Sequence, residues 1–123
     1  MGATAGNEPR PVTIEVQQFK FAVKPHPFRV APKYGEGGQF VFENNTPVDL
    51  DVDFLRDDLI RNAQGQFITA MAVKHESSSE QLTVNLDLPS GRYPYQVLVQ
   101  FGVALQPGFE ATGGSRPEVE IRK

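Results

Sequence analysis

The chain of 123 residues contains no cysteine and no tryptophan. Without cysteine it forms no disulfide, has no thiol nucleophile and offers no thiolate to a metal ion. A domain of this length buries a hydrophobic core large enough to fold without such cross-links. We therefore expect the fold to be held together by its core alone.

Long apolar runs and clusters of basic residues are also missing. No stretch is apolar enough to span a membrane. The formal net charge is −3, from 12 Lys and Arg against 15 Asp and Glu, so we expect no nucleic-acid partner. The first residues lack the basic start and apolar centre of a signal peptide. We interpret residues 1–11 as a flexible leader and residues 12–123 as a single domain.

What the chain does contain is a series of short alternating segments separated by glycine and proline. It has 11 Gly, 10 Pro and 9 Phe, a composition that favours strands over helices. The expected strands cover residues 12–23, 28–30, 39–43, 48–54, 67–73, 81–88, 93–101 and 118–122. This pattern predicts an all-β sandwich of seven to eight strands.

Three local features refine that expectation. The apolar positions change parity after Gln17, which predicts a bulge or bend there, because strand side chains alternate with a period of two. Residues 55–65 carry the only pattern compatible with a short helix. Residues 102–117 are rich in Gly and predict a long loop.

Several segments, in this order, resemble the cupredoxins, the plastocyanin-type proteins. The matching segments are residues 19–21 (FKF), 39–45 (QFVFENN), 48–54 and, best of all, 88–97 (LPSGRYPYQV). The last resembles the G-x-Y-x-Y-x-C strand of that family. The resemblance spans residues 12–122 and implies a Greek-key order of strands and a periplasmic or extracellular location.

The chain departs from this family at the copper ligands. The resemblance places the copper-binding cysteine at Val97 and the first copper-binding histidine at about Leu50, and residues 102–117 contain neither histidine nor methionine. Type 1 copper requires a thiolate, two imidazoles and a weak axial ligand. We therefore expect no type 1 copper site, and we expect Leu50 and Val97 to fill the former metal pocket as ordinary core.

A metal site of another kind is the first alternative. The imidazole and thioether ligands of the domain are His26, Met71 and His75, and nothing in their spacing makes them converge. The simpler interpretation is two exposed histidines and a core or edge methionine.

Three aspartates form a second group of weak metal candidates. On a strand, Asp49, Asp51 and Asp53 share one face about 7 Å apart, where carboxylates could hold Ca²⁺. The series is not an EF-hand loop, because Phe54 stands where that loop needs glycine. The simpler interpretation is a solvated face whose charges pair with Arg or Lys across the sheet.

No catalytic motif is present, and we expect neither an enzyme nor a bound cofactor. Tyr93 and Tyr95 are interpreted as core or rim residues rather than a sugar-binding platform.

The leading hypothesis is a copper-free cupredoxin-like domain, a binding or structural module of an exported protein. It would be a monomer or weak dimer and would meet a protein partner through residues 102–117, with Val103, Leu105 and Phe109 exposed. The alternatives are a metal-handling periplasmic protein, for copper or calcium, with a non-standard site, and an immunoglobulin-like accessory domain.

Overall fold

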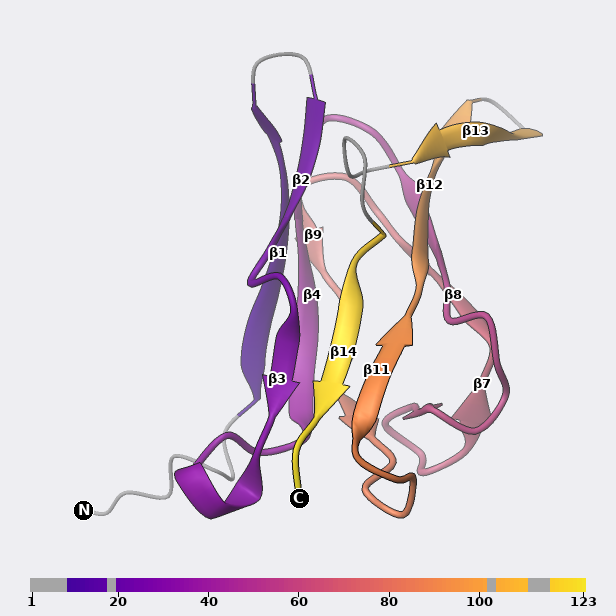
Figure 1. Ribbon diagram of the computed structural model, residues 1–123. Coiled ribbons are helices and arrows are strands. Elements are labelled where there is room, and N and C mark those ends of the chain that lie inside the picture. The colour runs from indigo at the N-terminus through magenta and orange to yellow at the C-terminus, as the bar shows by residue number, and fades with distance from the viewer. Residues whose placement is uncertain (1–8, 18–19, 102–103, 111–115) are drawn as a thin grey trace.

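The computed structural model describes residues 9–17, 20–101, 104–110 and 116–123. These residues form an all-β sandwich, as the sequence predicts (Figure 1). The strands are β1 (Arg10–Gln17), β2 (Lys20–Lys24), β3 (Phe28–Val30), β4 (Gln39–Asn45), β5 (Leu50–Asp53), β6 (Ile60–Arg61), β7 (Phe67–Ile68), β8 (Ala70–Val73), β9 (Ser77–Ser78), β10 (Leu82–Val84), β11 (Gly91–Pro94), β12 (Gln96–Phe101), β13 (Ala104–Glu110) and β14 (Glu118–Ile121). A short 3₁₀ helix, η2 (Pro32–Tyr34), follows β3. Within the described part of the chain, no helix has the length and apolar character needed to cross a membrane.

The strands form three sheets. The largest has the order β2-β1-β4-β10-β6-β7, with β9 pairing to β4. The other two have the orders β11-β14-β3 and β13-β12-β5-β8. Most pairs are antiparallel, but β1 runs parallel to β4 and β14 runs parallel to β3. Strands distant in the sequence are therefore neighbours, and β1 and β14 bring the two ends of the described chain into the sandwich.

The core lies between the sheets and is rich in aromatic rings. Phe28, Phe40 and Phe42 form a continuous row, with ring centroids 5.1 Å and 5.3 Å apart. Phe54 and Tyr95 extend the row, at 6.3 Å and 5.9 Å from Phe42. Aliphatic side chains of the facing strands complete the core. All five rings are 1% exposed or less. The aromatic residues of the alternating segments therefore point into the core, as a strand period of two requires.

The bulge or bend predicted near Gln17 is wrong, because β1 and β2 are separate strands of an antiparallel pair. Ile14 lies opposite Val23, and Val16 lies opposite Phe21. In such a pair, opposite residues share a face, and here even-numbered positions are opposite odd-numbered ones. The change of parity therefore follows from the reversal of the chain and needs no irregularity within a strand.

The short helix predicted at residues 55–65 is also absent, and turn chemistry explains why. The segment bends, enters β6 and then reverses into β7. The side-chain Oδ1 of Asn62 accepts hydrogen bonds from the backbone N–H groups of Gln64 and Gln66, at 3.0 Å and 2.9 Å. Gly65 takes a φ of 82°, which glycine adopts without steric cost. Local side-chain bonds to the backbone thus replace helical ones.

The long loop predicted at residues 102–117 contains a strand. β13 pairs antiparallel with β12, from Leu98 opposite Glu110 to Phe101 opposite Ala104, with a register shift between these positions. In Figure 1 it lies at the opposite end of the molecule from the C-terminus. The sequence did not predict this strand, because glycine and proline have low strand propensity and propensity alone does not reveal pairing with a neighbouring strand.

A non-glycine residue in the left-handed region gives a first testable prediction. Glu76, in the turn between β8 and β9, is exposed and has a φ of 52°. In this conformation a residue with a side chain is about 1–2 kcal/mol less stable than glycine. The greater conformational freedom of glycine in the unfolded chain offsets part of that difference. Glu76→Gly is therefore expected to raise the free energy of unfolding by about 0.5–1 kcal/mol, measured by urea denaturation.

Glu76→Ala is the matched control, because it removes the carboxylate but keeps a Cβ at the same φ. It is expected to leave the free energy of unfolding within about 0.5 kcal/mol of the original. An equal gain in both variants would show that the charge, and not the backbone, determines the effect.

Candidate functional site

The two positions that the resemblance assigns to copper ligands lie in the core. Leu50 in β5 and Val97 in β12 are each 0% exposed. The two strands are paired, with Leu50 opposite Val99 and Val97 opposite Val52. Their side chains therefore share one buried face with other aliphatic residues, as expected for ordinary core.

The three aspartates lie on the other face of the same strand. Asp49 precedes β5, and Asp51 and Asp53 lie within it; all three are half-buried. Uncharged residues stand directly opposite them in the register: Asp51 lies opposite Leu98 and Ala72, and Asp53 opposite Gln96 and Ala70. Asp53 instead accepts a hydrogen bond from the backbone N–H of Leu55, at 2.9 Å. Its carboxylate thereby caps the bend after the strand.

Asp49 has a partner that the sequence does not indicate. Its Oδ1 lies 2.8 Å from His75 Nδ1 and accepts a bond from the backbone N–H of His75, at 2.9 Å. The hydrogen bonds from the His75 side chain and then from its backbone hold the pKa of Asp49 below its usual value. The His75 side chain is 56% exposed and that of Asp49 is 45% exposed, so the pair fastens the β8–β9 turn to the start of β5 rather than enclosing a site.

The remaining metal candidates are not brought to this pair. His26 is exposed on the bend between β2 and β3, whereas Met71 is half-buried in β8 and packs against the core. Among the residues that the structure describes, no group of three His, Cys, Asp or Glu side chains is placed to hold a metal ion. Of the six predicted ligands, only Asp49 and His75 are hydrogen-bonded to one another in the described structure.

The partner surface predicted within residues 102–117 is only partly described. Val103 lies outside the described residues, and the side chains of Leu105 and Phe109 do as well. The prediction for the tyrosines is confirmed: Tyr93 is 9% exposed and Tyr95 is 1% exposed, so both belong to the core. Burial raises the pKa of Tyr95.

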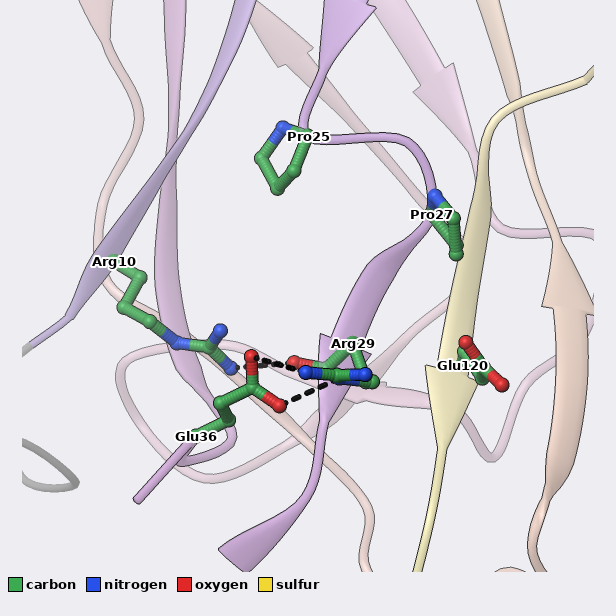
Figure 2. A pocket seen from close by; sticks show the side chains of 6 residues that line it. All are labelled: Arg10, Pro25, Pro27, Arg29, Glu36 and Glu120. Atoms are coloured by element: carbon green, nitrogen blue, oxygen red, sulfur yellow. Dashed lines mark hydrogen bonds and ion pairs between the residues drawn. The ribbon is translucent and has the colours of Figure 1, made fainter. Parts of the chain in front are cut away.

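A cluster of charged residues that the sequence did not single out lies around a hollow of about 280 Å³. We call this hollow the Arg10 pocket. It is lined by Arg10, Pro25, Pro27, Arg29, Glu36 and Glu120 (Figure 2). These residues come from the start of β1, the bend between β2 and β3, β3 itself, the turn after η2, and β14.

Strand pairing positions the charged groups of this pocket. Because β3 runs parallel to β14, Arg29 lies opposite Glu120 in the register. The carboxylate of Glu36 receives two bonds from Arg29, from Nε at 2.6 Å and from Nη2 at 3.3 Å. This forked contact lowers the pKa of Glu36. Glu120 in turn forms an ion pair with Arg122, at 3.3 Å.

Arg10 differs from Arg29 and Arg122 because it is half-buried and, among the described residues, is hydrogen-bonded only to neutral groups. Its Nη2 donates to the backbone oxygens of Arg29, at 2.9 Å, and of Gly37. The guanidinium lies over the ring of Phe28, 4.3 Å from the centroid. Burial lowers the pKa of Arg10, and Glu36 opposes that shift through its charge. The buried Nε has no hydrogen-bond partner among the described residues.

Sequence reasoning had no means of finding this pocket. Arg10 lies 19 residues from Arg29, and no spacing rule connects them. The one available signal was an arginine at the start of the first alternating segment. Comparison of the chain with family models, with curated proteins and with solved structures found no match.

Proposed function

We propose that this chain is a copper-free, cupredoxin-like domain that serves as a binding or structural module. The observation that carries the proposal is the burial of Leu50 and Val97, the positions that the resemblance assigns to two copper ligands. Both are packed among aliphatic neighbours on paired strands. Such a core stabilises the sandwich through apolar contact, so the fold does not depend on a metal ion.

The segments that resemble the cupredoxins support the same proposal. Phe42, Tyr93 and Tyr95, which belong to those segments, all lie in one core. A module of this kind acts through its surface, since its interior is filled. An exported location is part of the proposal and comes from the resemblance alone.

The alternative of a metal-handling protein has one feature in its favour, the contact between His75 and Asp49. Two exposed ligands hold an ion weakly, because a stable site needs three or four converging groups. The proposal therefore predicts that metal ions leave the folded state unaffected.

Thermal unfolding with excess Cu(I), Cu(II), Zn²⁺ or Ca²⁺, added one at a time, tests this prediction. We expect the melting temperature to stay the same, within about 1 °C, for every ion. A specific site occupied at 100 times its dissociation constant would add about 2.7 kcal/mol and several degrees. Such a shift would overturn the proposal.

Matched variants would then locate the metal. His75→Ala removes half of the Asp49 pair, and His26→Ala removes an exposed histidine elsewhere on the surface. Loss of the shift in His75→Ala alone would establish the alternative, a metal site built on that pair.

A further inference from the structure

The carboxylates of the Arg10 pocket are paired with arginines other than Arg10. Two guanidinium groups, those of Arg10 and Arg29, and two carboxylates, those of Glu36 and Glu120, line the pocket. Glu36 forms an ion pair with Arg29, and Glu120 forms one with Arg122, which lies outside the lining. Arg10 forms no ion pair with any described residue, and the charge of Glu36 acts on it only at longer range.

The guanidinium of Arg10 also has unused hydrogen-bonding capacity. Both of its bonds to described residues come from Nη2. Nε has no partner. In Figure 2 the other terminal nitrogen, Nη1, points toward the side of the pocket where Pro25 lies. A half-buried cation bonded only to neutral groups is costly, and an anion that reached it would recover that cost.

The walls of the pocket are partly apolar. Pro25 and Pro27 lie along one side, with the charged groups of Arg10, Arg29 and Glu36 on the other (Figure 2). A volume of about 280 Å³ is close to the lower end of known ligand sites. The pocket therefore combines a guanidinium that has no ion pair with a described residue and an apolar surface, a combination that suits an organic acid.

We propose that the Arg10 pocket binds a small organic monocarboxylate, with its carboxylate on Arg10 and its apolar part against Pro25 and Pro27. The proposal deepens the proposed function, since it gives the binding module a class of ligand. It does not depend on the likeness to cupredoxins.

The charge of the pocket selects among possible anions. A monocarboxylate brings one negative charge to Arg10, the guanidinium of the lining that has no ion pair with a described residue. A phosphate dianion brings more, and the second charge would be repelled by Glu36 and Glu120. A planar carboxylate also matches the fork of a guanidinium. Inorganic phosphate is therefore expected to bind more weakly than a carboxylate.

The experiment compares phenylacetate with phenylacetamide, its neutral isostere, on the full chain labelled with ¹⁵N. Backbone amide shifts are followed by NMR as each compound is added. A ligand of about ten non-hydrogen atoms is expected to have a dissociation constant on the order of 1 mM. Phenylacetate should shift the amides of residues around Arg10, Arg29 and Glu120, and phenylacetamide should bind at least ten times more weakly. Acetate, which lacks the apolar part, should also bind more weakly than phenylacetate.

Two variants change the affinity in opposite directions. Arg10→Gln removes the guanidinium that would hold the carboxylate and should weaken phenylacetate binding at least tenfold. Glu120→Gln removes a repelling carboxylate and should strengthen it two- to fivefold. Arg92→Gln is the matched control, because Arg92 carries the same charge, pairs with Glu118 on β14 and does not line the pocket. It should leave the affinity unchanged.

Three outcomes would overturn the inference: equal binding of phenylacetate and phenylacetamide, shifts located elsewhere on the sandwich, or phosphate binding more tightly than phenylacetate. The comparison of phenylacetate with phenylacetamide on the unmodified chain tests the proposal even if Arg10→Gln fails to fold. The result is independent of the metal titration, since a metal shift would overturn the copper-free module without affecting the Arg10 pocket.

Discussion

Phe42→Ala is expected to lower the free energy of unfolding by about 3–5 kcal/mol, the cost of removing a fully buried phenylalanine. Phe42 is 1% exposed and its ring meets those of Phe40, Phe54 and Tyr95, at 5.3, 6.3 and 5.9 Å. Alanine would remove all three contacts and leave a cavity between the sheets. Paired strands on both sides prevent the neighbours from closing that cavity, so little of the loss is recovered.

Urea denaturation followed by circular dichroism measures this effect. Phe67→Ala is the control, since Phe67 is 40% exposed and its ring lies under the guanidinium of Arg61, at 3.8 Å. The control should lose about 1 kcal/mol or less. Similar losses in the two variants would mean that Phe42 is not at the centre of the core.

Asn44→Ala is expected to lower the free energy of unfolding by about 2–4 kcal/mol, although it removes only one small polar group. Asn44 is 0% exposed. Its Nδ2 donates to the backbone oxygens of Val48, at 2.9 Å, and Val73, at 3.1 Å. Its Oδ1 accepts from the backbone N–H of Thr46, at 3.0 Å, and from the Thr46 hydroxyl, at 2.6 Å. The side chain thus joins the end of β4 to the following turn and to β8.

The large effect follows from what alanine would leave behind. The carbonyl of Val73 and the backbone N–H of Thr46 would lose partners inside the protein, and a buried unpaired group costs about 1–3 kcal/mol. Asn45→Ala is the control at the next position, where the side chain is exposed. It should change the free energy of unfolding by about 0.5 kcal/mol or less. Equal effects at both positions would contradict the role given to the buried amide.

The parts of the fold that could be predicted are those with a local signal. Residues 39–43 alternate, and Phe40 and Phe42 are buried as the alternation requires. Leu50 and Val97, which the resemblance predicted to fill the former metal pocket, are buried as well. The prediction for residues 39–43 uses only the period of a strand, which near neighbours in the sequence reveal.

The errors arose where the structure depends on a partner that the sequence does not name. The parity change after Gln17 fits a bulge and a hairpin equally well, and the pairing of Ile14 with Val23 decides between them. β13 is a strand because β12 lies beside it, in spite of the glycine and proline around it. Similarly, Asp49 has a defined role only because His75 lies 26 residues away and folds back onto it.

The sequence by itself determined the class of fold, the composition of the core and the lack of thiolate ligands. Periodicity and residue chemistry are local properties, so they do not depend on how the strands are arranged. Only the tertiary structure decided which charges meet. Arg29 lies opposite Glu120 because β3 runs parallel to β14, and Arg10 reaches the same pocket from β1. Whether a charge has an ion-pair partner depends on groups across the sheets, so the lack of such a partner for Arg10 among the described residues is a property of the folded chain alone.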